Sequence, residues 1–251
     1  MDNQVVVVTG GGRGIGYGIA SCFAEKGASL VLADIDLDTA QKAAAELNGK
    51  GAANAIAVAC DVTDRDQVAR MADRAVETFG RIDVLVNNAG ICPFVDFLDM
   101  TSEVWQHTLD VNLTGAFHCT QIVARKMIER GKGGYIVFVT SLAENVSNAN
   151  QVDYGASKAG LRMLMVGSSI ALAKFGITCN AVAPGMIMTP MVAHHWSKPE
   201  NQAFARERIP AGRIGTPEDV GRVVTFLASP AAAYVTGVSI RVDGGHQTRA
   251  V

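Results

Sequence analysis

The chain carries little charge for its length and has no surplus of either sign. Charged residues make up 18% of the 251 residues, and 22 basic residues stand against 24 acidic ones, which leaves a formal net charge of −2. Globular domains commonly contain about 25% charged residues. Without a basic surplus, nothing in the composition indicates binding to nucleic acid or to an anionic membrane. The hydrophobic content of 49% excludes an intrinsically disordered chain.

Metal-binding and membrane-spanning patterns are also missing. The five cysteines form no CxxC pair, and no cysteine or histidine spacing resembles a zinc site, so we predict no metal and interpret most cysteines as small buried residues. The longest uncharged stretch, Gly176–Ser197, contains two prolines, two histidines and several polar residues and is not a membrane span. A strand pattern begins by Val5 with no leader-like segment before it, so we expect a cytoplasmic protein.

Short apolar runs alternate with longer helical segments along the chain. Strands are predicted at Val5–Val8, Ser29–Ala33, Ala55–Ala59, Asp83–Val86, Tyr135–Val139, Thr178–Ala183 and Val238–Val242. Helices are predicted at Gly14–Lys26, Leu37–Leu47, Asp64–Phe79, Thr101–Arg130 with a break near Asn112–Gly115, Gln151–Phe175 and Pro217–Leu227. This order predicts the α/β class: a single doubly wound, Rossmann-type domain over residues 1–251, with a seven-stranded parallel sheet and helices on both faces. Ligands of such sheets bind beyond the carboxyl ends of the strands.

A glycine-rich turn follows the first strand and opens the first helix. Thr9–Gly16 has the sequence TGGGRGIG, with the spacing TGxxxGxG rather than GxGxxG. Its glycines let backbone N–H groups approach a pyrophosphate at a helix N-terminus. The turn therefore predicts a dinucleotide site that includes Gly10, Arg13, Gly14, Ile15 and Gly16.

Acidic residues follow the second and third strands. Asp34 ends the second strand, where a carboxylate can bind the adenosine ribose diol and would repel a 2′-phosphate, which predicts NAD rather than NADP. Arg13 favours NADP instead, because an arginine in this turn can bind a phosphate. Asp34 can also be the N-cap of the next helix. Asp61 can bind the adenine amino group, while Asp61 or Thr63 can equally cap the helix that follows.

Four polar residues form a candidate catalytic group. Tyr154 and Lys158 lie four residues apart on a predicted helix and so share a face. A tyrosine with a pKa of about 10 is a poor base at neutral pH, and a neighbouring ammonium lowers that pKa. Ser141, at the end of the fifth strand, can bond the same substrate oxygen, and Asn112, at the helix break, can hold a water behind Lys158. A Tyr-x-x-x-Lys pair is most often ordinary helix surface, but together with Ser141 and the glycine turn it predicts proton transfer.

These segments together resemble the short-chain dehydrogenase/reductase family over essentially the whole chain. The matching elements are Thr9–Gly16, Asp61–Val62, Asn87–Gly90, Asn112, Ser141, Tyr154–Lys158, Pro184–Gly185 and Val242–Gly245. The resemblance implies that Tyr154 is the general acid/base and that Ser141 polarises the carbonyl or hydroxyl. It also implies that Lys158 binds the nicotinamide ribose and lowers the pKa of Tyr154, with Asn112 in a proton relay.

The same resemblance extends the cofactor site and implies an assembly. Cofactor contacts are implied at Asp61, Val62, Asn88, Ala89, Gly90, Tyr154, Lys158, Pro184, Ile187 and Thr189. Family members are usually tetramers built on the two helices around Ala116–Glu129 and Val152–Lys174, so we expect a homotetramer. Packing within one chain explains the small residues of the second helix equally well.

The segment that follows Ser141 is polar and suggests the kind of substrate. Glu144, Gln151 and the residues between them include several amides, and buried polar groups need partners, which a polyhydroxylated substrate supplies. A solvated loop is the alternative. We expect the substrate to contact Ser141, Glu144, Gln151 and Tyr154. Residues 188–210 are expected to form a substrate lid, in which His194 and His195 are ligands or surface residues and in which Arg206 or Arg208 suits a carboxylate.

Ile91–Phe94 and Phe97–Met100, together with Gln151, are similar to the corresponding parts of bacterial L-rhamnose 1-dehydrogenases. The resemblance implies an NAD-dependent oxidoreductase that transfers a hydride between a nicotinamide cofactor and a hydroxyl or carbonyl of a sugar or sugar-derived acid. A 3-oxoacyl thioester reductase and another small-alcohol dehydrogenase of the family stay open as alternatives, although Asp34 and a pI near 6.2 disfavour the reductase. A non-enzymatic dinucleotide-binding protein is a further alternative. Such a protein would not need Tyr154 and Lys158, so the presence of both disfavours it.

Overall fold

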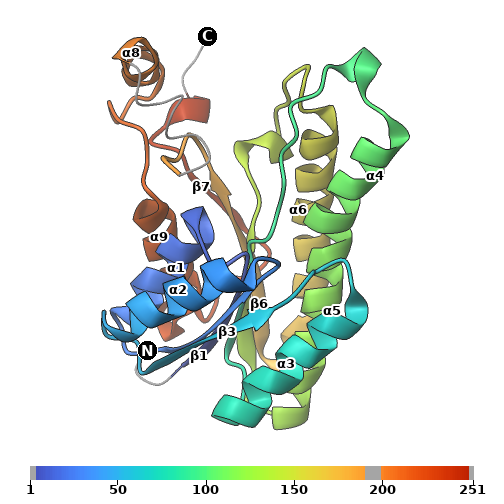
Figure 1. Cartoon of the computed structure of the whole chain (residues 1–251), viewed down its shortest axis with the longest axis vertical. Helices are drawn as coiled ribbons and strands as arrows, with labels where there is room; N and C mark the ends of the chain where they lie inside the picture. The colour runs from blue at the N-terminus through green and yellow to red at the C-terminus, as the bar shows by residue number, and fades with distance from the viewer. Residues whose placement is uncertain (1–3, 190–198, 249–251) are drawn as a thin grey trace.

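A computed structural model describes residues 4–189 and 199–248, and in it seven strands form one parallel sheet (Figure 1). The order across the sheet is β3-β2-β1-β4-β5-β6-β7. The strands are β1 Val5–Thr9, β2 Ser29–Asp34, β3 Asn54–Ala59, β4 Val84–Asn87, β5 Gly134–Val139, β6 Ile177–Pro184 and β7 Ser239–Val242. The predicted fold class is confirmed: this is a doubly wound, Rossmann-type sheet.

The sheet contains the topological feature at which such folds bind ligands. The chain runs outward from β1 to β3, returns, and adds β4 on the other side of β1, where Val6 pairs with Val84 and Val8 with Val86. The connections that leave β1 and β4 therefore diverge to opposite sides, which opens a crevice at their carboxyl ends. This crevice lies beside the glycine turn.

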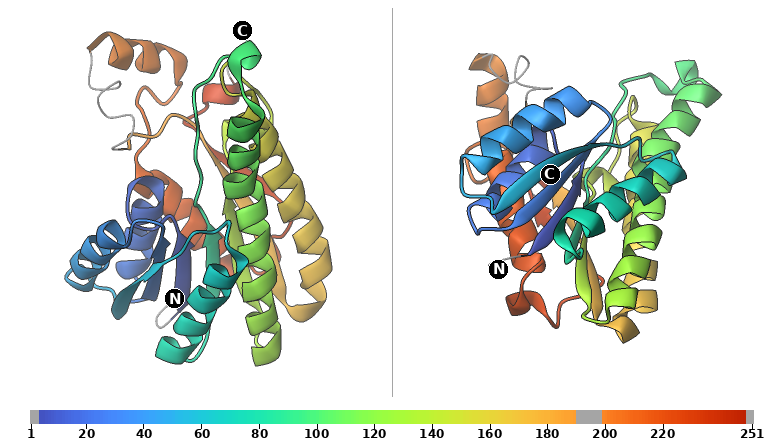
Figure 2. Two further views of the ribbon diagram at one scale, coloured as in Figure 1. Left: turned by 45° about the vertical axis from the view of Figure 1, so that its right-hand side comes forward. Right: turned by 60° about the horizontal axis from the view of Figure 1, so that its bottom comes forward.

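Helices cover both faces of the sheet (Figures 1 and 2). On one face lie α1 Gly14–Ala24, α2 Leu37–Asn48 and α9 Pro217–Leu227, and on the other lie α3 Arg65–Phe79, α4 Ser102–Leu109, α5 Gly115–Arg130 and α6 Val152–Leu172. A further helix, α8 Pro199–Arg208, projects beyond the sheet near the described end of the chain (Figure 1). The sequence pattern does not predict α8, because its residues lack a clear apolar stripe.

Each face of the sheet has its own apolar core. Phe23 of α1 and Leu47 of α2 are fully buried against one face, and Met71 of α3 and Met127 of α5 are fully buried against the other. Full burial of such a side chain contributes about 1.5–3 kcal/mol. The β-branched run of β1 contributes to both cores, which explains why it is continuously apolar.

The predicted break of the helix near Asn112 is wrong, because the helix changes its winding there and does not stop. A π-helical segment, Asp110–Thr114, joins α4 to α5 without interruption, and the Gly115 N–H donates to the Asp110 carbonyl five residues earlier. The wider turn lets Asn112 leave the regular helical register, and its side chain is fully buried. Such segments occur frequently at functional sites.

The alternatives that assigned N-caps to Asp34, Asp61 or Thr63 are also wrong. The N-cap of α2 is Asp36, whose side chain accepts the Thr39 N–H, and the N-cap of α3 is Asp64. Asp34 and Asp61 are therefore not used to begin these helices.

Four cysteines are buried and Cys92 is half-buried. Among the described residues no helix is both long and apolar enough to cross a membrane.

Candidate active site

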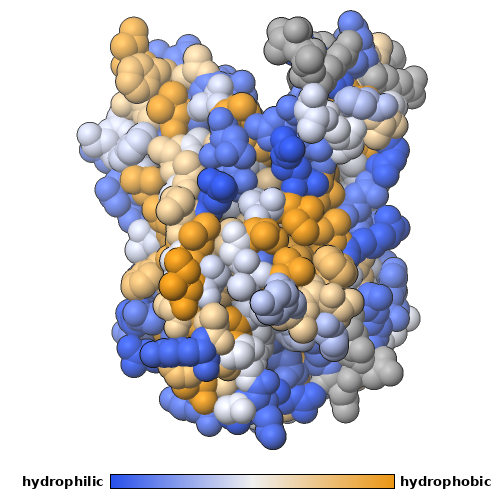
Figure 3. All heavy atoms as spheres, turned by 180° about the vertical axis from the view of Figure 1, so that it is seen from behind, coloured by the Kyte–Doolittle hydropathy of each residue, from blue (hydrophilic) through white to orange (hydrophobic). Residues whose placement is uncertain are grey.

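The residues singled out from the sequence gather at the carboxyl-terminal edge of the sheet. Seen from behind, the molecule is hollowed at the upper end, between a lobe on the α4 side and a lobe on the α8 side (Figure 3). The loops that follow β1, β2, β4, β5 and β6 all start at this edge because the strands are parallel. The edge thus brings together groups from five separate parts of the chain.

The glycine turn is built for close backbone approach. Gly10 and Gly14 have φ of +61° and +58°, in the left-handed region that favours glycine. A Cβ on Gly16 would lie 2.1 Å from the Gly10 carbonyl oxygen, so no side chain fits there. The Asn88 amide donates to the carbonyls of Thr9 at 2.9 Å and Gly10 at 3.0 Å, which fixes the turn against the end of β4.

The N-terminus of α1 has free donors where an anion can bind. Its N-cap, Arg13, is exposed and makes no capping hydrogen bond, and the first turn of α1 contains no acidic residue. In contrast, the first turns of α2, α3 and α9 are capped by the side chains of Asp36, Asp64 and Thr216. Helix N-termini with unused N–H groups attract phosphate groups. The turn therefore fits the pyrophosphate of a dinucleotide.

Asp34 is a buried carboxylate beside this turn. Its Oδ2 accepts the Gly12 N–H at 3.0 Å, and its Oδ1 accepts the Asp36 N–H at 3.1 Å. Each carboxylate oxygen has two acceptor sites, so both oxygens can still bind a ribose hydroxyl. A negative charge held here by backbone donors opposes a second phosphate at the same position.

Further cofactor candidates surround the turn. Asp61 accepts the backbone and side-chain hydrogens of Thr63 at 2.9 and 2.8 Å, which orients its carboxylate after β3. Val62 is buried against α5, where a Cβ on Gly115 would lie 2.5 Å from its side chain. Thr189 lies above the turn, since a Cβ on Gly14 would be 3.7 Å from it.

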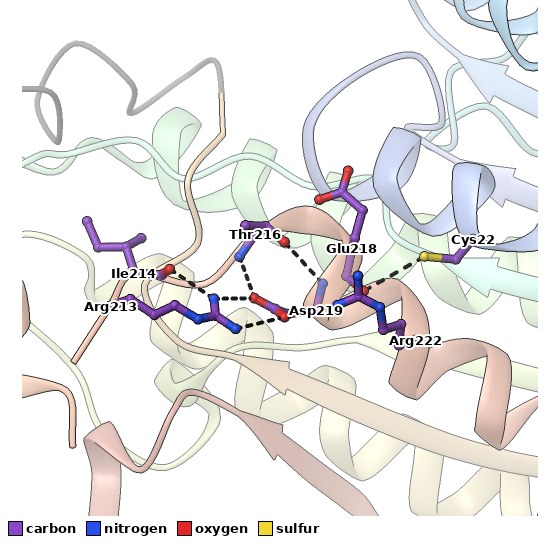
Figure 4. A network of polar contacts seen from close by, with 7 residues as sticks. All are labelled: Cys22, Arg213, Ile214, Thr216, Glu218, Asp219 and Arg222. Carbon is purple, nitrogen blue, oxygen red and sulfur yellow. Dashed lines mark hydrogen bonds and ion pairs between the residues drawn. The ribbon is translucent and has the colours of Figure 1, made fainter. Parts of the chain in front are cut away.

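The segment that follows Pro184 at the end of β6 is held in place by the residues that precede α9. Gly215 and the Ile187 region form a short parallel bridge, in which the Met188 N–H donates to the Gly215 carbonyl at 2.8 Å. Next to the bridge, Asp219 binds the two terminal nitrogens of Arg213 at 2.6 and 3.0 Å and accepts the Thr216 N–H at 2.8 Å (Figure 4). The Arg213 guanidinium holds the pKa of Asp219 down at about 2. This network fixes the loop that supports Ile187.

Tyr154 and Lys158 lie on one face of α6, as predicted. The buried Lys158 ammonium donates to the Val139 carbonyl at 3.0 Å and lies 5.5 Å from the centre of the Tyr154 ring. Ser141 follows β5 by two residues, and its Oγ accepts the Ala143 N–H at 3.1 Å. The three side chains therefore converge where β5 meets α6.

Burial controls the protonation of this group. It raises the pKa of Tyr154 to about 12, although a hydrogen bond with Ser141 acts in the opposite direction. Burial also lowers the pKa of Lys158 to about 8. The net shift of the Tyr154 pKa in this structure is therefore upward, opposite to the lowering expected from Lys158, because desolvation disfavours both charged forms.

Asn112 is tied to the loop that follows β4. Its Oδ1 accepts the Ile91 N–H at 2.8 Å, and its Nδ2 donates to the Ile91 carbonyl and to Ser157, each at 2.9 Å. A Cβ on Gly90 would lie 3.1 Å from Asn112 Oδ1 and 3.4 Å from Lys158 Nζ. Asn112 and Lys158 therefore flank the same glycine, and a Cβ at this position would be a tight fit between them.

The polar segment after Ser141 divides into a buried and an exposed part. The Glu144 side chain is only 2% exposed and lies 3.6 Å from Arg162, while its Oε2 has no hydrogen-bond partner among the described residues. Residues 145–149 are exposed, as the solvated-loop alternative expects. At the end of the segment, the Gln151 amide donates to the Cys92 sulfur at 3.0 Å and accepts from Asn148 at 2.7 Å.

Some residues of the site escape prediction from the sequence, and others lie outside the described residues. The sequence indicates no role for Cys92 beyond the resemblance of Ile91–Phe94, and its contact with Gln151 places it at the site. Asp153 is fully buried beside Tyr154 and accepts the Thr108 hydroxyl at 2.6 Å, a pairing across 45 residues that no local pattern signals. His194 and His195 lie outside the described residues, as does the side chain of Arg206.

Comparisons with known proteins agree with this geometry. A family model described as "Enoyl-(Acyl carrier protein) reductase" matches residues 10–247. The L-rhamnose 1-dehydrogenase (NAD(P)(+)) of Azotobacter vinelandii is 44% identical and covers 97% of this chain and 96% of its own. The 3-oxoacyl-[acyl-carrier-protein] reductase FabG of Thermotoga maritima is 41% identical, with 98% of each chain covered. A crystal structure of a short-chain type dehydrogenase/reductase from Mycobacterium marinum superposes with a TM-score of 0.91 at 36% identity and covers 98% of this chain and 96% of that one.

Proposed function

The chain belongs to the short-chain dehydrogenase/reductase family and is an oxidoreductase acting on CH–OH groups; on that premise we propose that it oxidises a hydroxyl of a sugar or sugar-derived acid with NAD. The observation that carries the sugar assignment is Gln151, three residues before Tyr154, whose amide is held by Cys92 and Asn148. A relative that covers nearly the whole chain carries the name of a sugar dehydrogenase, which supports the same class.

The described residues fit a nicotinamide dinucleotide. The uncapped N-terminus of α1 would hold the pyrophosphate, and Asp34 would hold the adenosine ribose. Asp61 and Val62 would contact the adenine, and Asn88–Gly90 would line the path of the cofactor between its two ends. The nicotinamide end would contact Pro184, Ile187 and Thr189. Lys158 would bind the second ribose. We propose NAD as the preferred form because Asp34 places a negative charge where NADP carries its extra phosphate.

The proposed chemistry places one proton transfer at Tyr154. The cofactor supplies the acceptor for the hydride that leaves the substrate carbon. Tyr154 removes the proton of the substrate hydroxyl, and the Lys158 ammonium nearby favours the phenolate that can do so. The Ser141 oxygen already accepts the Ala143 N–H, so its own hydrogen can donate to the substrate oxygen. Asn112 keeps the Ile91 loop and the Ser157 hydroxyl in place behind this group.

The substrate would be recognised by directed hydrogen bonds. The Cys92 contact fixes which way the Gln151 amide points, and a fixed amide can reject a compound that offers it no hydroxyl. A site that hydrogen-bonds hydroxyl groups rejects analogues without them by roughly 10⁴–10⁵-fold. Its own polar groups stay unpaired when such an analogue binds. We therefore propose Ser141, Gln151 and Tyr154 as substrate contacts; the Glu144 carboxylate is covered in this structure.

A panel of substrates tests the proposal. The absorbance of NADH is followed with NAD and aldoses, deoxy-aldoses, sugar acids, simple secondary alcohols and steroids, and in the reverse direction with NADPH and a 3-oxoacyl thioester. We expect measurable turnover with at least one sugar or sugar acid and little with the alcohols and steroids. The thioester reductase is the second candidate, because one relative of similar identity has that name. A preference for the thioester or for medium-chain alcohols would overturn the sugar assignment.

We also propose that the chain forms a homotetramer through α5 and α6. These helices border an open groove of about 250 Å³, and apolar side chains on the same two helices, among them Phe117 and Ile170, are exposed. Exposed apolar patches of this kind mark contact surfaces. Light scattering during size-exclusion chromatography should give a mass near four chains, and Phe117→Glu should reduce it. A monomeric wild-type chain would contradict this part of the proposal.

A further inference from the structure

Two buried hydrogen bonds join α4 and the π-helical segment after it to the start of α6. Thr108 Oγ1 lies 2.6 Å from Asp153 Oδ2, and Asn112 Nδ2 lies 2.9 Å from Ser157 Oγ. All four residues are fully buried. The second bond lies about one helical turn beyond the first on both segments. The two bonds are therefore successive rungs of one polar ladder between α4 and α6.

Tyr154 lies between the two rungs of this ladder. Asp153 precedes it directly in the first rung. In the second rung the Ser157 hydroxyl accepts from Asn112 and donates to the Tyr154 carbonyl at 2.7 Å. The backbone on both sides of Tyr154 is thus tied to the neighbouring segment, while its phenol bonds Ser141. A shift of about 1 Å at a reacting group lowers a rate by roughly 100-fold, so these ties bear on catalysis.

The rung formed by Thr108 and Asp153 is hard to explain by stability alone. Among the described residues the Thr108 hydroxyl is the one hydrogen-bond partner of the Asp153 side chain, whose Oδ1 is buried without any. Thr108 Oγ1 also lies 3.0 Å from the Val104 carbonyl oxygen, so the threonine has an acceptor even without the carboxylate. Burial of a carboxyl group with few partners opposes folding, and an apolar side chain often replaces such a group without loss of stability.

We propose that Thr108 and Asp153 are positioning residues of the reaction, because their hydrogen bond fixes the first turn of α6 against α4 and so places the Tyr154 phenol beside Ser141. Both side chains are covered and act through Tyr154. The proposal rests on the proposed role of Tyr154 in proton transfer. It holds for a sugar and for a thioester substrate, because the same phenol carries the proton in both reactions.

Thr108→Val tests the first rung, since it keeps the branched shape of the side chain and removes the hydroxyl. Turnover is followed by NADH absorbance with NAD and the most active sugar or sugar acid of the panel, or by NADPH absorbance with the thioester if that compound is preferred. We expect kcat to fall by roughly 10-fold or more, with KM and NAD affinity nearly unchanged. Thr108→Ser keeps the hydroxyl and should retain most of kcat.

A double-mutant cycle with Tyr154→Phe separates positioning from a general loss of structure. If Thr108 acts through the phenol, Thr108→Val should lower kcat little further in the Tyr154→Phe background, whereas a structural role would lower kcat by the same factor in both backgrounds. Thr225→Val is the matched control, because Thr225 is also buried and its hydroxyl donates within α9 to the Arg222 carbonyl at 2.9 Å. This control should leave kcat unchanged.

Asp153→Leu removes the same rung from the other side and keeps the test independent of Thr108→Val. The Thr108 hydroxyl still has the Val104 carbonyl, so no new unpaired group is buried, and Tm should be retained while kcat falls. Asp153→Asn keeps an oxygen that accepts the Thr108 hydroxyl and should retain most of kcat.

The results distinguish this proposal from the proposed function. Near-normal turnover in Tyr154→Phe would overturn the role of Tyr154 and the positioning role with it. If Tyr154→Phe loses turnover as expected, normal kcat in Thr108→Val and Asp153→Leu would overturn the positioning proposal alone. Equal effects of Thr108→Val in the two backgrounds, or loss of kcat in Thr108→Ser as severe as in Thr108→Val, would also overturn it.

Discussion

Asp34→Ala should change both the stability of the chain and its choice of cofactor. In the structure the Asp34 carboxylate accepts the N–H groups of Gly12 and Asp36, and its side chain fills the end of β2 beside the glycine turn. Alanine leaves both backbone donors without their acceptor. The substitution also removes the negative charge that we propose for recognition of the adenosine ribose.

The two effects have different sizes. A donor left unsatisfied costs ~1–3 kcal/mol, so the two donors together should lower the free energy of unfolding by roughly 2–4 kcal/mol once water reaches part of the vacated volume. For a chain of this length that corresponds to a fall in Tm of roughly 5–15 °C. Loss of hydrogen bonds to a charged group costs ~1.5–3 kcal/mol, so kcat/KM for NAD should fall by roughly 10–150-fold. The value for NADP should fall less, since repulsion of its 2′-phosphate disappears.

The ratio of kcat/KM for NAD to that for NADP is the decisive measurement. A general distortion of the turn would weaken both cofactors equally and leave this ratio unchanged, whereas loss of the charge lowers it. Asp38→Ala is the matched control, because Asp38 is an exposed acid in the first turn of α2. Equal kcat/KM for the two cofactors in the wild type, or an unchanged ratio in Asp34→Ala, would refute the assigned role of Asp34.

Three further predictions concern the reaction. Tyr154→Phe should lower kcat by at least ~100-fold, the scale of general acid–base catalysis, with NAD affinity in a fluorescence titration nearly unchanged; near-normal turnover would contradict the assignment of the base. Because burial raises the pKa of Tyr154 to about 12, the phenolate is scarce at neutral pH, and kcat/KM for oxidation should rise with pH. Lys158→Met should move this rise to higher pH because it removes the ammonium that favours the phenolate, and an unchanged pH profile in the variant would show that Lys158 does not assist Tyr154. Gln151→Leu should reduce kcat/KM for the sugar more than it reduces NAD affinity, with Asn145→Leu as an exposed control on the same segment; intact sugar kinetics in Gln151→Leu would mean that the segment is solvated loop.

The glycine turn and the Tyr154 helix could both be predicted from local patterns. The turn could be placed at the end of β1 because a cluster of glycines between a strand and a helix is typical of a phosphate-binding loop. Tyr154 and Lys158 could be placed on one face because the helical period decides which residues four apart are neighbours. Neither inference needs to know what lies across the fold.

The structural details that local patterns could not predict depend on partners distant in the sequence. Asn112 lies in a π-helical turn and bonds the Ile91 backbone, and Gln151 is oriented by Cys92, 59 residues away. Glu144 belongs to a polar run and yet is covered, with Arg162 of α6 beside it. Local composition cannot distinguish such a buried carboxylate from a solvated one.

The sequence by itself therefore determined the order of strands and helices, the dinucleotide turn and the identity of the polar group around Tyr154. Only the tertiary structure decided the direction of their pKa shifts, since desolvation by neighbouring elements raises the pKa of Tyr154 and lowers that of Lys158. Periodicity and turn chemistry are local, whereas burial and the satisfaction of polar atoms are properties of the whole fold.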